Sequence, residues 1–493
     1  MQAAAAKPVR TIGAVALAVV FLCLALTSTA RAADSVFWGN FGPSTLSRAN
    51  IGEGGGADIP IAAGLVDGPW GVAIDSAAGK IYWANENSSS IGYANLNGSG
   101  GALLNIAGAT VNQPNGLAID PVAGRIYWPN FLESKILFAN LNGSGGGELN
   151  TVGATLDRPS GVAVDRASGR LYWTNYGANK ISFANLDGSG GGGDLDTSGA
   201  PVEGPEGLAI NASANRVYWA NYDSDTIGFA NLSGGAGGQL DTGGAIINEP
   251  AGIAIDPFAN RAYWANIGNS TIAYASLSGA GGGQIGTSGA TTSGIGFPVL
   301  QQRPRNLEFP AVQGQHRPGA TLSCTQGTWR GDLLESFLYV APQTFAYQWF
   351  RNGKAETGAT SSSFTASKVG TYSCVVTATN FAGSDSAVSA IDFSVNATVG
   401  FKKVTFNRKK GTAMLRVAVT GTGRLDLYGK GVTNVSRKKA TGTTKLVVRA
   451  TGKARIKLAK TGKAKVKARI SYTPEGGQAI KRFKAIVLKK RRR

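Results

Sequence analysis

The sequence predicts an all-β protein in which a six-bladed β-propeller is followed by two smaller β-sandwiches. Three observations predict this architecture. An aromatic-Trp-x-Asn motif recurs six times at intervals of 45 or 46 residues, a period typical of propeller blades. Two cysteines flank a tryptophan after the repeats, and parts of residues 396–493 alternate apolar and basic positions. The six motif copies are Phe37-Trp38-Gly39-Asn40, Tyr82-Trp83-Ala84-Asn85, Tyr127-Trp128-Pro129-Asn130, Tyr172-Trp173-Thr174-Asn175, Tyr218-Trp219-Ala220-Asn221 and Tyr263-Trp264-Ala265-Asn266.

Residues 1–32 have the pattern of a secretory signal peptide. Lys7 and Arg10 precede an apolar run, and small residues near Ala32 suit a cleavage site. A transmembrane anchor is the alternative, but the run is shorter than the roughly 20 apolar residues that span a bilayer. A lipoprotein site at Cys23 is disfavoured by the bulky Leu22 before it. We expect a secreted or cell-surface protein with no transmembrane span.

Cysteine and histidine usage restricts the chemistry. After the signal the cysteines are Cys324 and Cys374, an even pair that suits an oxidising compartment. The one histidine, His316, lies outside the repeats, which disfavours imidazole-ligated metals and Ser-His catalysis. We therefore expect no metal, no cofactor and no catalytic residues.

Composition divides the remainder into three domains, at residues 34–300, 303–395 and 396–493. The whole chain has a formal net charge of +20. Residues 396–493 contain 29 Lys and Arg but only Asp426 and Glu475 as acids, a net charge of +27. The rest of the chain is therefore acidic, and the basic character belongs to the last domain alone.

Each repeat is expected to form four strands joined by tight turns. The first strand ends in Asp or Asn, whose side chain can accept N–H groups of the turn. Four positions later comes a residue type that tolerates left-handed backbone, and then a cation. A metal or anion ring is the alternative, but the regular place of these residues in a hairpin favours a structural role. The three rows are Asp75, Asp120, Asp165, Asn211 and Asp256; Gly79, Gly124, Gly169, Asn215 and Asn260; and Lys80, Arg125, Arg170, Arg216 and Arg261.

The count of strands predicts a closed ring. The N-terminal unit begins directly at Val36 and lacks a first strand, whereas five clear first strands follow. Residues 294–300 resemble the missing strand and would leave no exposed edge if they paired with the N-terminal unit. An open β-solenoid is the alternative, but the incomplete ends complement each other. The five first strands open at Pro69, Pro114, Pro159, Pro205 and Pro250.

The Tyr-Trp-x-Asn motif with its upstream Gly-φ-Ala-φ-Asp strand resembles the YWTD propellers of low-density-lipoprotein-receptor relatives, and more loosely NHL-type propellers. The resemblance covers about residues 34–300 and implies the fold. Asn stands where the family has the final Asp, and the epidermal-growth-factor-like modules of those receptors are missing. Receptor function is therefore not implied. A streptogramin-lyase-like propeller would be an enzyme precedent, but we expect such an enzyme to use histidine.

Function is expected where the six copies differ. The residue after each Trp-x-Asn opens a turn on the same face as the loops that lead into strand one. This ring is unusually aromatic for turns, so it could stack on a sugar or clamp a peptide. Packing of blade against blade is the alternative. The candidate ligand-binding residues are Phe41, Glu86, Phe131, Tyr176 and Tyr222 from the turns, with Trp70, Asn115 and Glu206 from the lead-in loops.

Residues 303–395 resemble the immunoglobulin-like modules that are common in exported bacterial proteins. The resemblance rests on Cys324, Trp349 and the run Gly370-Thr-Tyr372-Ser-Cys374. It implies a disulfide between two sheets that packs on Trp349, and a tyrosine corner at Tyr372. The long interval from Cys324 to Trp349 implies an insertion around residues 331–342, and a spacer or adhesion role is expected.

The last domain is predicted to be a small β-sandwich with a cationic face. Period two places the cations of Lys463, Lys465, Lys467 and Arg469 on one face and the intervening apolar residues on the other. Arg455 and Lys457 are expected to continue this pattern. The field would attract a polyanion. Export argues against cytosolic nucleic acid, so teichoic acid, acidic polysaccharide or anionic lipid headgroups are favoured, and a solubilising role is the alternative.

Two functional hypotheses follow. The first is a non-enzymatic binding or adhesion protein of the cell envelope, with the propeller as ligand scaffold and the basic domain as anchor. The second is a propeller lyase or hydrolase acting on extracellular glycan or peptide, with Glu86, Glu206 and Asp223 as candidate acid–base residues. Acidic residues in these loops look too few and scattered for a metal site.

Overall fold

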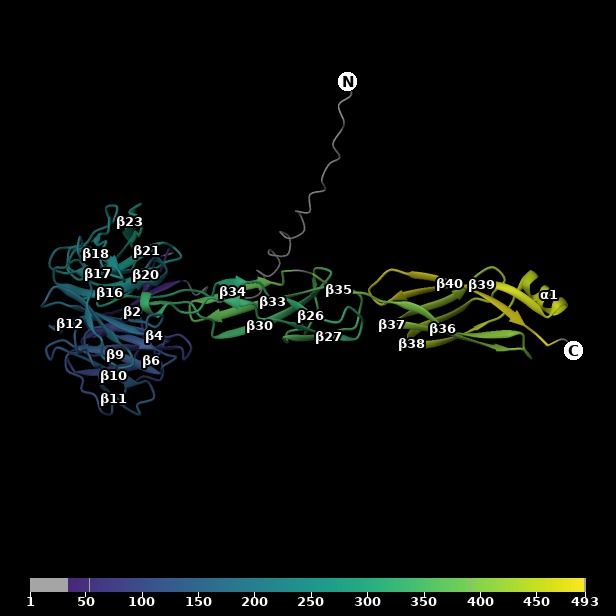
Figure 1. Ribbon diagram of the computed structural model, residues 1–493, viewed down its shortest axis with the longest axis horizontal. Helices are drawn as coiled ribbons and strands as arrows, with labels where there is room; N and C mark the ends of the chain where they lie inside the picture. Colours follow the sequence, from purple (N-terminus) through teal and green to yellow (C-terminus); the bar gives the residue numbers. More distant parts are fainter. Residues whose placement is uncertain (1–33, 53, 391, 492–493) are drawn as a thin grey trace, which may run out of the picture.

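The computed structural model describes residues 34–52, 54–390 and 392–491. The propeller, a middle sandwich and a tail sandwich follow one another along an elongated molecule, and helix α1 lies at the end away from the propeller (Figure 1). The predicted signal peptide at residues 1–32 lies outside the described residues.

The propeller consists of six antiparallel sheets, each with a four-stranded blade, as predicted. In chain order the full blades begin with the strand nearest the axis. They are β4(Pro69–Asp75), β5(Lys80–Asn85), β6(Ser90–Asn95) and β7(Ala102–Leu103); β8(Ala118–Asp120), β9(Arg125–Asn130), β10(Lys135–Asn140) and β11(Gly146–Glu148); β12(Pro159–Asp165), β13(Arg170–Asn175), β14(Lys180–Asn185) and β15(Gly193–Asp194); β16(Pro205–Asn211), β17(Arg216–Asn221), β18(Thr226–Asn231) and β19(Gly238–Gln239), with the 3₁₀ turn η1(Ala212–Ala214); and β20(Pro250–Asp256), β21(Arg261–Asn266), β22(Thr271–Ser276) and β23(Gly282–Gln284).

The remaining blade closes the ring, as the strand count predicts. It joins β24(Val299–Gln301) to β1(Ser35–Asn40), β2(Thr45–Asn50) and β3(Gly56–Asp58). Val36 lies opposite Leu300 in the antiparallel register of β1 and β24. A further bridge between Asn40 and Ile295 extends the pairing toward the start of the segment. The two ends of the repeat region therefore complete one blade, and the solenoid alternative is wrong.

The repeated Asp, Gly and cation rows are structural. Asp120 Oδ1 accepts the backbone N–H groups of Val122 and Ala123 at 3.1 and 3.0 Å, and the other blades make similar turns. All five residues of the turn row have left-handed φ. Each cation stacks on an aromatic ring of the next strand, as Arg170 does on Phe183 at 4.4 Å from the ring centroid.

The motif Trp and Asn tie each blade to the loop that leads into it. All six tryptophans are fully buried. Trp219 Nε1 and Asn221 Nδ2 donate to the carbonyl oxygen of Pro201 at 2.9 and 3.1 Å, and Asn221 Oδ1 accepts the N–H of Glu203 at 3.0 Å. Four of the other blades repeat this acceptance by the motif Asn at 2.9 to 3.1 Å. The Asn side chain both donates and accepts a hydrogen bond, which an ionised Asp side chain cannot do. This explains why Asn stands at the last position of the motif.

We expect Asn221→Asp to lower the free energy of unfolding by about 1–3 kcal/mol near neutral pH, because the new carboxylate would be buried against the Pro201 carbonyl. Urea unfolding followed by tryptophan fluorescence would measure the loss. Asn142→Asp is the matched control, because exposed Asn142 acts as an acceptor, from the N–H of Ser144. Equal stability of the two variants would contradict this role of the motif Asn.

Glycines around the axis let the inner strands approach closely, and one phenylalanine fills the space they leave. Backbone hydrogen bonds link neighbouring blades here, for example from Gly116 N to the Ser160 carbonyl at 2.9 Å. In the closing blade Phe297 makes the corresponding bond, to the Trp70 carbonyl at 3.1 Å. A Cβ added to Gly116 would lie 3.1 Å from the Phe297 ring. The glycines of this ring are Gly71, Gly116, Gly161, Gly207 and Gly252.

The middle sandwich packs two main sheets around a small core. Trp349 is fully buried there, Cys324 and Cys374 are buried within the same cluster, and the disulfide between these cysteines links β27 to β33. Its strands are β25(Asn306–Glu308), β26(Val312–Gly314), β27(Ala320–Cys324), β28(Thr328–Trp329), β30(Thr344–Arg351), β31(Lys354–Ala355), β32(Ser363–Ala366), β33(Gly370–Asn380), β34(Gly383–Val388) and β35(Phe393–Val395).

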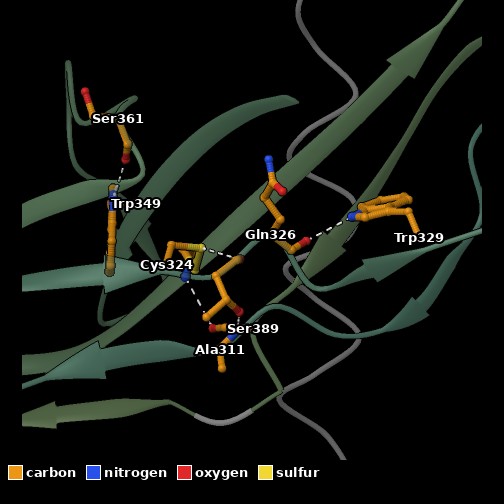
Figure 2. The surroundings of a disulfide bond; sticks show 9 residues. Ala311, Cys324, Gln326, Trp329, Trp349, Ser361 and Ser389 are labelled. Atoms are coloured by element: carbon orange, nitrogen blue, oxygen red, sulfur yellow. Dashed lines mark hydrogen bonds between the residues drawn. A yellow bond between two sulfur atoms is a disulfide. The ribbon is translucent and has the colours of Figure 1, made fainter. Parts of the chain in front are cut away.

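The features expected around the disulfide are present. Trp349 lies opposite Cys374 in the register of β30 and β33. Its Nε1 donates to the Ser361 carbonyl at 2.9 Å, which holds the ring upright beside the disulfide (Figure 2). The Tyr372 hydroxyl donates to the Lys368 carbonyl at 2.8 Å, the hydrogen bond of a tyrosine corner.

The predicted insertion docks on the propeller. It contains the 3₁₀ turn η2(Leu334–Ser336) and β29(Leu338–Tyr339), which pairs parallel with β24 and adds a strand to the closing blade. The turn η2 contacts the inner strands β8, β12, β16 and β20 where those strands end. Ser336 donates to the Ile210 carbonyl, and Phe337 lines the axial space together with Phe297. The space left there is about 10 Å³, so the axis is closed.

The tail sandwich largely follows the predicted pattern. Lys463, Lys465, Lys467 and Arg469 are exposed and the residues between them are buried. One expectation is wrong, because Arg455 and Lys457 lie on helix α1(Gly452–Thr461) and not on a strand. Helix-forming residues at 453–460 and a left-handed Gly462 at the C-terminal cap explain the difference. The strands are β36(Val399–Asn407), β37(Thr412–Tyr428), β38(Val435–Val448), β39(Lys463–Pro474) and β40(Ile480–Lys489).

Candidate ligand-binding face of the propeller

Two sets of loops meet on the face of the propeller opposite the docked insertion. We call this the upper face: it comprises the turns at 41–44, 86–89, 131–134, 176–179, 222–225 and 267–270, with the lead-in loops at 65–70, 110–115, 155–160, 201–206, 246–251 and 291–296. Backbone hydrogen bonds join the two sets in every blade, as from Tyr222 N to the Gly204 carbonyl at 3.0 Å. The predicted ligand residues of the turns and of the lead-in loops therefore share one surface.

The aromatic candidates are half-buried and pack between neighbouring blades. The rings of Phe41 and Trp70 are 5.6 Å apart, edge to face, and those of Phe131 and Tyr176 are 6.1 Å apart. The Tyr176 hydroxyl donates to Asp223 Oδ1 at 3.1 Å. Packing of blade on blade is thus part of what these rings do, and each pair also keeps an exposed edge.

Glu206 is the buried carboxylate of the upper face. The Ser160 hydroxyl donates to Glu206 Oε2, and the Thr174 hydroxyl donates to the Glu206 backbone carbonyl. Thr174 Oγ1 also accepts the N–H of Gly161 at 2.8 Å. Sequence reasoning missed Thr174, although it is the one hydroxyl residue at the x position of the six Trp-x-Asn motifs. This outlier could have identified the network.

Burial raises the pKa of Glu206 to about 7, against an ordinary value of 4.5, although the Ser160 hydrogen bond opposes the shift. The negative charges of Glu86 and Asp223 raise the pKa further. Burial also raises the pKa of Glu86. The fold therefore brings together carboxylates that looked scattered along the chain, and burial disfavours the ionised forms of Glu206 and Glu86.

Two buried polar atoms of the upper face have no hydrogen-bond partner among the described residues. They are Trp70 Nε1, a donor, and Asn115 Oδ1, an acceptor on a side chain that is 7% exposed. Leaving a buried polar group unpaired costs about 1–3 kcal/mol.

The upper face is strongly acidic. Its loops contain nine carboxylates and one cation, Arg158, whose guanidinium lies over the Tyr176 ring at 5.2 Å. The carboxylates are Asp67, Glu86, Glu133, Asp157, Glu203, Glu206, Asp223, Asp225 and Glu249. Such a surface attracts cationic ligands and repels anionic ones.

Across residues 34–52, 54–390 and 392–491, no group of three or more His, Cys, Asp or Glu side chains is placed to hold a metal ion. Within the same described part of the chain, no helix has the length and apolar character needed to cross a membrane.

Comparison with known proteins bears on the propeller. Residues 79–121 match the family described as low-density lipoprotein receptor repeat class B. Among solved structures, the chain is similar to one in a nidogen/laminin complex, with 17% identity over 54% of this chain and 98% of that chain and a TM-score of 0.46. It is also similar to the hydrazine synthase of Kuenenia stuttgartiensis, with 13% identity over 42% of this chain and 76% of that chain and a TM-score of 0.33. A functionally unknown protein of Desulfotomaculum acetoxidans DSM 771 is similar with 13% identity over 54% of this chain and 98% of that chain and a TM-score of 0.39. No curated protein matches the chain. The six four-stranded blades show a β-propeller, and the family match covers part of two of these blades.

Proposed function

We propose that this protein is a secreted, non-enzymatic binding protein whose propeller binds a cationic segment of another protein on its upper face. The observation that carries the proposal is the charge of the upper face, nine carboxylates against one cation, on the face that also holds buried Glu206. The acidic loops select the charge of the ligand, and the half-exposed aromatic edges suit the alkyl stems of Lys and Arg. A carbohydrate ligand is less favoured because a neutral sugar would leave this charge unpaired.

Binding to a cationic ligand should increase with pH across the pKa of Glu206. Ionised Glu206 attracts a cation and the protonated form does not, so affinity for a pool of Lys- and Arg-rich peptides should rise between about pH 6 and 8. Isothermal titration with the full chain would measure it, and Glu206→Gln should remove the pH dependence. The control is Glu148→Gln, which removes a carboxylate paired with Lys135 outside the upper face. Preference for Asp- and Glu-rich peptides would contradict the proposal.

Glu206 should also make the stability depend on pH in a defined direction. Because its folded-state pKa is raised, the folded protein holds this proton more tightly than the unfolded chain, so stability falls as pH rises from about 4.5 to 7 and is then level. At about pH 8, Glu206→Gln should therefore be more stable than the wild type by roughly 2–3 kcal/mol. Thermal unfolding of the wild type and of Glu206→Gln at about pH 4.5 and about pH 8 would test this prediction. If the variant were less stable than the wild type at both pH values, the raised pKa of Glu206 would be contradicted.

We further propose that the middle sandwich is an immunoglobulin-like spacer and that the tail sandwich anchors the protein to a polyanion of the cell envelope. The exposed Lys463, Lys465, Lys467 and Arg469 of β39 support the anchor, joined on the same face by Lys481 and Lys489 of β40. The full chain should be retained on immobilised polyphosphate and released at about 0.5 M salt. Absence of retention would overturn the anchor without affecting the propeller.

An enzymatic role is the second candidate, supported by one observation. A carboxyl with a pKa of about 7 near other carboxylates has the properties of a general acid or base. A lyase or hydrolase acting on extracellular glycan or peptide would then lose its turnover in Glu206→Gln. Unchanged turnover in that variant would exclude this role for Glu206.

A further inference from the structure

A cationic cleft lies at the tip of the tail sandwich, the end of the molecule away from the propeller (Figure 1). Backbone hydrogen bonds assemble it: Arg491 N donates to the Arg408 carbonyl at 2.9 Å, and Lys490 N donates to the Gly462 carbonyl at 2.9 Å. These bonds hold the β36–β37 turn, the end of β40 and the end of α1 together around a volume of about 1130 Å³. We call it the tip cleft; its walls include Phe406, Arg408, Lys409, Lys460, Lys490 and Arg491.

The described walls of the tip cleft carry cations and no carboxylate. The two acids of the tail lie elsewhere. Asp426 pairs with Arg424 at 3.0 Å, and Glu475 lies at the other end of the sandwich, where its carbonyl accepts the N–H of Val369. The described residues of the cleft wall thus give it a net positive charge, and phosphate groups are the chemistry it would attract.

Apolar side chains are exposed at the same tip. Phe406, in the cleft wall, is 47% exposed, and Ile456 on α1 is 57% exposed. Leu458 is the buried residue of α1, and a helix places a residue two positions away on the opposite side. Ile456 therefore points away from the protein, between the cations Lys453 and Lys460 one turn to either side. Water is a poor environment for both side chains, and a soluble phosphate polymer would leave them in water.

We propose that the tip docks on an anionic phospholipid bilayer, with the tip-cleft cations on headgroup phosphates and with Phe406 and Ile456 at the boundary of the acyl chains. Cations beside exposed apolar residues are the combination that binds such interfaces. The inference rests on the proposed polyanion anchor and names its partner. Docking by this end directs the upper face of the propeller away from the membrane, because the insertion occupies the opposite face of the propeller.

Vesicle sedimentation of the full chain tests the proposal. Wild type should bind phosphatidylcholine vesicles containing about 30% phosphatidylglycerol and should not bind pure phosphatidylcholine vesicles. The double variant Phe406→Ser/Ile456→Ser keeps every charge, so it should bind polyphosphate normally and lose about tenfold in affinity for the anionic vesicles. The matched control is Val122→Ser/Phe309→Ser, which removes two exposed apolar side chains outside the tail and should bind as wild type does. Circular dichroism checks that the variants fold.

The outcomes separate this inference from the anchor on which it rests. Undiminished vesicle binding by the double variant would overturn it, because charge alone would then explain the binding. Binding of wild type to polyphosphate but not to anionic vesicles would also overturn it and leave the polyanion anchor intact. Binding to neither would overturn both.

Discussion

Phe337→Ala should destabilise the propeller by about 3–5 kcal/mol, although Phe337 belongs to the next domain of the chain. Its ring is 7% exposed and packs against Phe297 and the aliphatic residues of the inner strands. Removing the ring would open a cavity on the axis, where the rigid circle of blades cannot collapse to fill it. Denaturant unfolding followed by fluorescence of the buried blade tryptophans would measure the loss.

A glycine variant provides an internal comparison. Phe337 has a φ of 55°, the left-handed region in which a residue with a Cβ is strained. Phe337→Gly loses the same ring but relieves this strain, so it should be more stable than Phe337→Ala by about 1 kcal/mol. If both variants lowered the free energy of unfolding by less than about 1 kcal/mol, the insertion would contact the propeller without stabilising it.

Removal of the disulfide should have an effect of similar size. Cys324 and Cys374 are separated by 50 residues, and cross-linking a loop of that length stabilises by about 4 kcal/mol through the unfolded chain. The docked insertion lies inside this loop, between Cys324 and Trp349. We therefore expect Cys324→Ala/Cys374→Ala to destabilise the middle sandwich directly. The propeller should be destabilised indirectly, because the insertion that holds Phe337 in the axial space is then less firmly held by the middle sandwich.

Hydrogen exchange would resolve the two effects. Amides of β30 and β33 report the middle sandwich, and amides of β24 report the closing blade to which β29 is paired. Combining the cysteine variant with Phe337→Ala should give less than the sum of the two effects in β24. Full additivity there would contradict the coupling of the two domains.

The closed axis also bears on function. Many ring-shaped folds offer a central channel as a ligand path, but Phe297 and Phe337 fill this one. The face opposite the upper face is covered by the insertion, where Ser336 donates to the Ile210 carbonyl, and by the segment after β24, where Gln302 Nε2 donates to Asp256 Oδ2. The upper face thus remains as the large loop surface of the propeller, and the unpartnered atoms of Trp70 and Asn115 lie there.

Much of the upper face was predictable from the chain, because the turns and lead-in loops stand at fixed offsets from each motif. Phe41, Trp70, Asn115 and Glu206 were placed on this surface by offset alone, and the structure puts them there. The hydrogen bonds of Glu206 were not predictable, because Ser160 and Thr174 belong to a neighbouring blade. The same holds for its raised pKa, which depends on burial, on Glu86 from another blade and on Asp223 from a separate turn of the same blade.

The sequence by itself determined the blades, their turns, the closing segment near residue 294 and the cationic strand face of the tail. The turns and the cationic strand face depend on turn chemistry and alternation within about ten residues, whereas the blades and the closing segment follow from comparison of the repeats along the chain. Tertiary structure decided that the axis is closed, that the acidic residues converge, and that Arg455 and Lys457 lie on a helix at the tip. The physical reason is that closure and convergence require contacts between residues distant in the chain, and that the same short basic-apolar run can suit a strand or a helix until packing selects one.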